Sequence, residues 1–327
     1  MLGTRFGVSD GVGRVLIWNV PSATRTDLPQ IVLGQPNFTS SGQFGGTTTA
    51  PSMCAPIGLH SDGTHLFVGE QCANRATMWN TLPTVTQQPA DFALGQPDLV
   101  TSTQNTGGVS ARSLYGRSHP PTDGTHVFVA DTLNHRVLIW NTMPAMNAKD
   151  ADVALGQPTK MANTPNSGGI SGTSLFRPTM CYVSGGKLIV ADGGNNRVLI
   201  WNALPTTDGQ AANVVLGQPD MMTNTAATTP SSKSVTNPNA LHVDASGRLY
   251  VTDSANHRIL YWNAIPTANY VAADGVIGQP NMDVGPPNNG GIGARTLQWP
   301  GAVLSSGTNL LYVLDSGNDR MLLMPRP

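Results

Sequence analysis

Charged residues are scarce in this chain. Asp, Glu, Lys and Arg make up 11% of its 327 residues, and 18 basic residues against 19 acidic ones give a formal net charge of −1. A nucleic-acid-binding surface needs clustered Lys and Arg to displace counterions, so no nucleic-acid partner is expected. Thr, Ser, Asn and Gln must supply solubility instead, and such a composition is more typical of an exported protein than of a cytosolic one.

Long apolar runs and a leader sequence are also lacking. No stretch of 18 apolar residues occurs, so the sequence predicts no membrane span. The start, MLGTRFGVSD, has neither a basic region nor an apolar core, so no signal peptide is visible and we expect upstream residues to have been removed. Of three cysteines, Cys54 and Cys72 share one repeat. A disulfide between them would indicate an extracellular, cell-surface or periplasmic location.

What the chain does contain is a repeat of 61 or 62 residues. The stretch FVADTLNHRVLIWN, residues 128–141, returns in near-copies, and its arginine recurs at Arg14, Arg75, Arg136, Arg197, Arg258 and Arg320. A second marker, LGQP or IGQP, recurs at the same interval, with its glycine at Gly34, Gly95, Gly156, Gly217 and Gly278. A fixed period of this length indicates a repeated supersecondary unit.

Each unit has the pattern of four short strands. In residues 178–219 the runs are PTMCYVS, GGKLIVAD, NRVLIWN and NVVLGQP, each rich in apolar residues and bounded by Gly, Asn, Asp or Pro. Six four-stranded antiparallel units predict an all-β fold, a six-bladed β-propeller whose terminal blades meet at the seam of the ring. The first copy lacks strand one and the last lacks strand four. We therefore expect 22 strands in a single domain, residues 1–327.

Long polar insertions follow the fourth strand of five units, for example residues 37–53 and 220–237. Because antiparallel strands alternate in direction, each insertion leaves its sheet at the same end as the loop between strands two and three. Loops of about 20 residues in a compact domain are usually functional or disordered. We therefore expect this insertion face to bind a protein, peptide or glycan partner.

The motifs VADTLNHRVLIWN, VADGGNNRVLIWN and VTDSANHRILYWN resemble NHL repeats, and the resemblance extends over essentially the whole chain. At the place of the Asn-His-Leu triplet this chain has NHR at residues 134–136 and 256–258 and NNR at 195–197. The resemblance implies a six-bladed propeller. Such rings include RNA- and protein-binding modules, a zinc-dependent amidating lyase and strictosidine synthase-like and gluconolactonase-like enzymes, so the fold alone leaves binding and catalysis open.

An acidic residue and an arginine bracket the loop between strands two and three. A charge-assisted hydrogen bond that closes each hairpin explains this recurrence better than a crown of anion-binding arginines, because every blade needs the same contact. The predicted structural pairs are Asp131 with Arg136, Asp192 with Arg197, Asp253 with Arg258, and Asp315 with Arg320. Glu70 takes the acidic position in the second copy.

Histidine breaks the repeat. His60 and His242 each lie four residues after the proline that opens strand one, Tyr182 has the same offset, and His119 lies near the start of strand one in copy three. Strand one lines the channel of a propeller, so these four residues are candidate binding residues. His60, His119 and His242 are candidate zinc or copper ligands, as the resemblance to the amidating lyase also implies, and calcium is a further candidate. We expect the other four on the surface: His65, His126, His135 and His257.

The sequence thus favours an extracellular or surface-associated binding module that is not an enzyme. One alternative is a metal-dependent lyase or hydrolase with its site in the central channel. Another is a structural subunit of a larger extracellular assembly, whose polar loops would become ordered only against a partner. No nucleophile elbow, phosphate-binding loop or dinucleotide fingerprint occurs, and no catalytic residue can be assigned.

Overall fold

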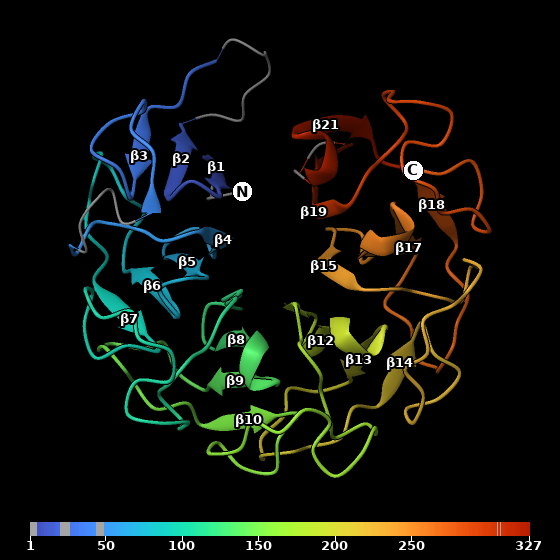
Figure 1. Ribbon diagram of the computed structural model, residues 1–327, viewed down its shortest axis with the longest axis horizontal. Helices are drawn as coiled ribbons and strands as arrows, with labels where there is room; N and C mark the ends of the chain where they lie inside the picture. Colours follow the sequence, from blue (N-terminus) through green and yellow to red (C-terminus); the bar gives the residue numbers. More distant parts are fainter. Residues whose placement is uncertain (1–4, 20–26, 44–48, 306, 308) are drawn as a thin grey trace. The chain divides into compact units, whose positions relative to one another are not determined.

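The computed structural model describes residues 5–19, 27–43, 49–305, 307 and 309–327. The chain divides into two compact units, Met1–Thr164 and Pro165–Pro327, and each contains three antiparallel sheets (Figure 1). In the described residues 21 strands form six sheets, which we number I to VI in chain order. The prediction of an all-β fold is confirmed. None of these residues forms a helix long and apolar enough to cross a membrane.

The first unit contains sheets I to III, and within each sheet consecutive strands are hydrogen-bonded neighbours. Within the described residues sheet I has no first strand, as the sequence predicts. Its strands are β1 (Phe6–Asp10), β2 (Arg14–Trp18) and β3 (Ile31–Leu33). Sheet II comprises β4 (Pro56–Ser61), β5 (Leu66–Glu70), β6 (Arg75–Trp79) and β7 (Phe92–Leu94), and sheet III comprises β8 (Val127–Asp131), β9 (Arg136–Trp140) and β10 (Val153–Leu155).

The second unit contains sheets IV to VI, built on the same plan. Sheet IV comprises β11 (Met180–Ser184), β12 (Lys187–Asp192), β13 (Arg197–Trp201) and β14 (Val214–Leu216). Sheet V comprises β15 (Pro238–Val243), β16 (Leu249–Asp253), β17 (Arg258–Trp262) and β18 (Gly275–Ile277). Sheet VI comprises β19 (Pro300–Ser305), β20 (Leu310–Asp315) and β21 (Arg320–Pro325), and the part of the chain that the structure describes adds no fourth strand, again as predicted.

The core lies between successive sheets. In the second unit, for example, Val198 and Ile200 on β13 pack with Leu241, Val251 and other apolar side chains of sheet V, all buried. A sheet covered on both faces needs apolar residues at consecutive positions, because neighbouring side chains of a strand point to opposite faces. This explains why the strands read as continuous apolar runs.

One expected strand is missing. The sequence predicts a first strand for sheet III, but residues 117–122 form only an isolated bridge between Thr122 and Val127. Pro120 and Pro121 have no N–H to donate, so this segment cannot form a regular ladder. The segment packs instead against sheet II, where an added Cβ on Gly58 would lie 2.7 Å from the carbonyl oxygen of Ser118. The prediction of 22 strands is therefore wrong by this one.

The loop between strands two and three forms one turn of 3-10 helix in four sheets: η2 (Thr132–Asn134), η3 (Gly193–Asn195), η4 (Ser254–Asn256) and η5 (Ser316–Asn318). Each turn ends in a residue with left-handed backbone, such as His135 with φ of 54°. Strand four ends in the same way, because Gly217 of the GQP motif has φ of 87°, where a side chain would be strained. Both changes of chain direction lie at the end of the sheet from which the insertions leave, which is the insertion face.

Candidate functional site

Four of the six repeated arginines are buried beneath the insertions: Arg75, Arg136, Arg197 and Arg258. In sheet IV, Arg197 Nε donates to Asp192 Oδ2 at 2.8 Å, and Nη1 donates to the carbonyl oxygen of Met221 at 2.6 Å. Its Nη2 donates to the carbonyl oxygens of Ser171 and Ser174, both at 2.9 Å. These bonds use four of the five N–H donors of a guanidinium that is itself buried, so Arg197 is not placed to bind an anionic ligand.

The predicted acidic partners occupy equivalent positions. Nε–Oδ2 distances are 2.7 Å in the pairs Asp131–Arg136, Asp253–Arg258 and Asp315–Arg320, and Glu70 pairs with Arg75 at 2.9 Å. The other oxygen of each carboxylate accepts a backbone N–H, from Phe176 in the case of Asp192. Burial raises the pKa of Asp192, whereas the charge of Arg197 lowers it. These contacts close the hairpins and anchor the insertions.

The insertions are folded by internal bonds. In the insertion between sheets II and III, the carbonyl oxygen of Leu99 accepts from Arg75, and that of Ser113 accepts from Arg136 at 2.8 Å. In the middle, Asn105 and Asn134 exchange two amide hydrogen bonds of 2.9 and 2.7 Å. The described part of this insertion is therefore held at both ends and in the middle without a partner molecule.

Sequence reasoning missed a set of exposed apolar side chains on these insertions. Val100, Met161 and Met222 are 46%, 78% and 72% exposed. Each stands five residues after the glycine of the GQP motif, and directly after the residue whose carbonyl oxygen binds the buried arginine. Their common distance from that glycine is the feature of the sequence that could have identified them. The backbone that carries them is fixed, so the apolar groups are displayed at defined positions.

His242 and Tyr182 occupy adjacent first strands of the second unit. The backbone N–H of Ser305 on β19 donates to His242 Nε2 at 3.0 Å, so Nε2 is unprotonated. His242 Nδ1 lies 3.3 Å from Tyr182 Oη on β11, and this hydroxyl also donates to the carbonyl oxygen of Val243. Burial lowers the pKa of His242 to about 4, although Asp244 opposes the shift. Both ring nitrogens of His242 therefore have protein partners.

His60 and His119 lie in the first unit. His60 Nε2 is 3.1 Å from the carbonyl oxygen of Thr122, and burial lowers its pKa to about 4. His119 packs over β4, where an added Cβ on Gly58 would lie 3.1 Å from its Cδ2. Within the described ranges no group of three His, Cys, Asp or Glu side chains could hold a metal ion. As placed, His242 does not fit a metal site, and the zinc, copper or calcium site stays a prediction.

Two of the four histidines expected on the surface are buried. His135 and His257 occupy the left-handed position that ends η2 and η4. His257 Nδ1 accepts the backbone N–H of Trp299 at 3.1 Å, and the two rings meet edge to face. His65 and His126 do pair with Asp62 and Asp123 in the turns between strands one and two.

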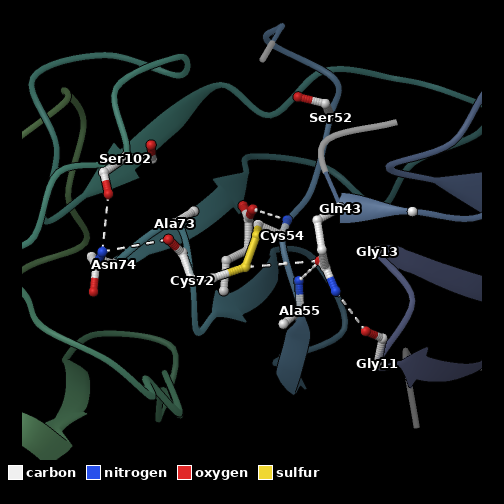
Figure 2. Close-up of a disulfide and its surroundings, with 12 residues drawn as sticks. Gly11, Gly13, Gln43, Ser52, Cys54, Ala55, Cys72, Ala73, Asn74 and Ser102 are labelled. Carbon is white, nitrogen blue, oxygen red and sulfur yellow. Dashed lines mark hydrogen bonds between the residues drawn. A yellow bond between two sulfur atoms is a disulfide. The ribbon is translucent and has the colours of Figure 1, made fainter. Parts of the chain in front are cut away.

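A disulfide joins Cys54 and Cys72, whose Cα atoms are 5.4 Å apart (Figure 2). The N–H of Cys54 donates to Glu70 Oε2, as the N–H of Phe176 does to Asp192. Gln43 braces the same place from the preceding insertion, because its amide nitrogen donates to the carbonyl oxygen of Gly11 and its oxygen accepts from Ala55 (Figure 2). Cys181 is buried and is not part of this disulfide.

Six repeated antiparallel sheets, each of up to four strands and with their apolar faces buried between neighbours, define a six-bladed β-propeller. The family model described as NHL repeat matches residues 236–260, which include β15 and β16. No curated protein matches the sequence.

The chain is similar to solved structures at low sequence identity. A crystal structure of a nidogen/laminin complex gives a TM-score of 0.51 at 14% identity, covering 98% of this chain and 88% of that chain. A structure of U3-55K gives 0.49 at 10% identity, with coverages of 98% and 77%. The WD40 β-propeller domain of Doa1 gives 0.48 at 10% identity, with coverages of 98% and 89%. The first of these likenesses shows the fold and nothing beyond it.

Proposed function

We propose that residues 1–327 form one propeller domain that acts as an extracellular or surface-associated interaction module. It binds a protein, peptide or glycan partner through the insertion face. The NHL-type propeller supports the general role, since such folds commonly serve as protein-binding modules. The observation that carries the choice of face is the exposure of Val100, Met161 and Met222 at one repeat position.

Rigid display is what makes these side chains suited to binding. The carbonyl oxygen that precedes Met222 accepts a 2.6 Å hydrogen bond from Arg197, which is itself buried and ion-paired. Methionine adapts its shape to different apolar surfaces. A backbone that is already ordered loses little conformational entropy when a partner binds, so more of the contact energy appears as affinity. Apolar side chains that an ordered loop holds exposed to solvent are therefore best explained by a role in binding a partner.

The disulfide supports the proposed location. Disulfides persist in oxidising compartments, and thiols in the cytosol are kept reduced. Thiol labelling of the natively expressed protein after denaturation tests this point. Labelling of Cys181 alone is expected, whereas labelling of all three cysteines would contradict an extracellular or periplasmic location.

Partner capture with two sets of variants tests the face. Val100→Ser/Met161→Ser/Met222→Ser removes the apolar groups of the insertion face. Val85→Ser/Met146→Ser is a matched control, because these residues are 58% and 59% exposed in the turns between strands three and four, at the other end of their sheets. Each form is used as bait for extracellular proteins and glycans, with quantitative mass spectrometry for the proteins and a glycan array for the sugars.

The insertion-face variant should lose partners that the unmodified chain captures, and the control variant should retain them. Loss with the control variant alone would place binding at the other end of the sheets. Equal capture by all three forms would show that these apolar groups do not contribute, and the proposed face would be wrong.

A further inference from the structure

The insertion between sheets I and II differs from the others in the turn that follows its GQP motif. Asn37, Phe38 and Thr39 form an Asn-x-Ser/Thr triplet, and no other asparagine of the chain begins one. In exported proteins this triplet is the acceptor for N-linked glycans, provided that it lies on a surface loop. Asn37 and Thr39 are both exposed and lie in an insertion, so this condition is met.

The side-chain oxygen of Asn37 holds the turn together. Its Oδ1 accepts the backbone N–H groups of Thr39 at 3.0 Å and of Ser40 at 2.8 Å, and it accepts both hydroxyl groups at 2.9 Å. The amide nitrogen, Nδ2, makes no hydrogen bond to the described residues, and it is not among their buried atoms without a partner. The turn therefore depends on the oxygen of this amide and not on its nitrogen.

The same turn in two other insertions has no amide nitrogen at all. Asp98 and Asp220 occupy the equivalent position, three residues after the glycine of the GQP motif. Asp98 Oδ1 accepts the N–H of Val100 at 2.9 Å, and Asp220 Oδ1 accepts that of Met222 at 2.8 Å. A side-chain oxygen atom is thus what each turn requires. A substituent on Nδ2 of Asn37 would leave the corresponding contacts intact.

The backbone of the triplet is tied to sheet I. Arg14 Nη1 donates to the carbonyl oxygen of Phe38 at 2.6 Å, as Arg197 does to that of Met221. Thr39 stands five residues after the glycine of its GQP motif, the position that three later insertions fill with Val100, Met161 and Met222. The first insertion therefore displays a hydroxyl group on an ordered turn where those three display an apolar side chain.

We propose that Nδ2 of Asn37 carries an N-linked oligosaccharide. This inference rests on the extracellular or surface location proposed above, because the oligosaccharide is added to exported chains. The donor is an oligosaccharide linked to a lipid diphosphate. A bond forms between Nδ2 and C1 of the first sugar, the bond from C1 to the diphosphate oxygen breaks, and the lipid diphosphate leaves. The transferase accepts one proton of the amide, and it recognises the acceptor by the hydroxyl group of Thr39.

The oligosaccharide gives the first insertion a role different from that of the next three. A glycan is bulky and strongly hydrated, so it keeps an apolar partner surface away from the turn that carries it. The three exposed apolar residues of the insertion face lie in insertions that contain no Asn-x-Ser/Thr triplet. Contact with a protein or peptide partner is therefore directed to those insertions.

Mass spectrometry of the natively expressed chain tests the site. Digestion with peptide N-glycosidase in water labelled with heavy oxygen converts a glycosylated asparagine into an aspartate that carries one heavy oxygen atom. This label is expected at Asn37 and at no other asparagine. An Asn37 that carries no glycan and gains no label would overturn the proposal.

Variants of the turn separate recognition of the triplet from folding. Thr39→Ala should abolish the glycan, whereas Thr39→Ser should retain it. Ser40→Ala is the matched control, because it removes the other hydroxyl group bonded to Asn37 and leaves the triplet unaltered, so it should still be glycosylated. Asn37→Asp, which reproduces Asp98 at its turn, should fold but carry no glycan. A glycan that persists in Thr39→Ala, or one that is lost in Ser40→Ala, would show that the triplet is not the acceptor.

Thiol labelling of the same preparation distinguishes failure of this proposal from failure of the proposed location. A chain with Cys54 and Cys72 joined but Asn37 unmodified would overturn the glycan and leave the location standing. Three free thiols together with an unmodified Asn37 would overturn both.

Discussion

Replacement of Arg197 by methionine should be among the most destabilising single changes in this protein. The guanidinium makes four hydrogen bonds: one to Asp192 and three to backbone carbonyl oxygens, two before the sheet and one after it. Methionine fills similar volume but leaves the carboxylate of Asp192 buried without its counter-charge. Breaking a buried ion pair from one side costs about 3–5 kcal/mol.

An exposed pair supplies the control. Arg112 and Asp150 form a salt bridge of 2.7 Å with both side chains largely exposed. Pairs of this kind contribute about 0–1 kcal/mol, because water and salt screen them. Arg112→Met should therefore have a small effect. Arg320→Met should have an effect between the two, since Arg320 is partly exposed and makes one bond fewer than Arg197 to the residues that the structure describes.

Guanidinium chloride unfolding followed by tryptophan fluorescence measures these differences. The denaturant concentration at the midpoint should be highest for Arg112→Met, lower for Arg320→Met and lowest for Arg197→Met. The dependence of the unfolding free energy on denaturant concentration should be similar in all three. If Arg197→Met proved no more destabilising than Arg112→Met, the buried arginines would not anchor the insertions, and the argument for a rigid insertion face would fail with them.

Three further predictions concern the histidines and cysteines. The free energy of unfolding should decrease by about 3 kcal/mol from His242 alone as the pH falls from 6.5 to 4, because the pKa of His242 is about 4 in the folded chain and 6.5 in the unfolded chain. Urea unfolding of His242→Gln should show a weaker dependence of this free energy on pH. The same pH dependence in the variant and the unmodified chain would contradict the low pKa of His242. Cys54→Ala/Cys72→Ala should lower the free energy of unfolding by about 2–4 kcal/mol, since the disulfide closes a short loop; an unaltered melting temperature would argue against a structural role. Elemental analysis should find zinc and copper well below one ion per chain, because both nitrogens of His242 have protein partners; near-stoichiometric metal that disappears in His60→Ala/His242→Ala would favour a channel metalloenzyme instead.

The sheets could be predicted from the sequence because their signals are local. Apolar runs bounded by Gly, Asn, Asp and Pro gave strand four of sheet IV as residues 213–219, and β14 is Val214–Leu216. The prediction of a first strand in sheet III was wrong for an equally local reason. Pro120 and Pro121 have no N–H groups to donate to β8, although the surrounding repeat continues.

The site was less predictable, because many of its bonds involve backbone carbonyl oxygens. The pairing of Asp192 with Arg197 follows from a recurring spacing, but the partner of Arg197 Nη1 is the carbonyl of Met221, and any residue type could supply it. Burial of His257 likewise depends on Trp299, 42 positions away, in an insertion that does not repeat closely. Neither contact has a sequence signature.

The arginine bonds also determine how opening of one part of the chain spreads to the next. The insertion between sheets II and III is tied to β6 through Leu99 and to β9 through Ser113. Releasing it breaks bonds in both sheets, so the cost of local opening is shared between neighbours, as in other repeat proteins. Segments rich in Ser, Thr, Asn and Gly should then resist proteolysis like parts of a core, although their composition is that of flexible linkers.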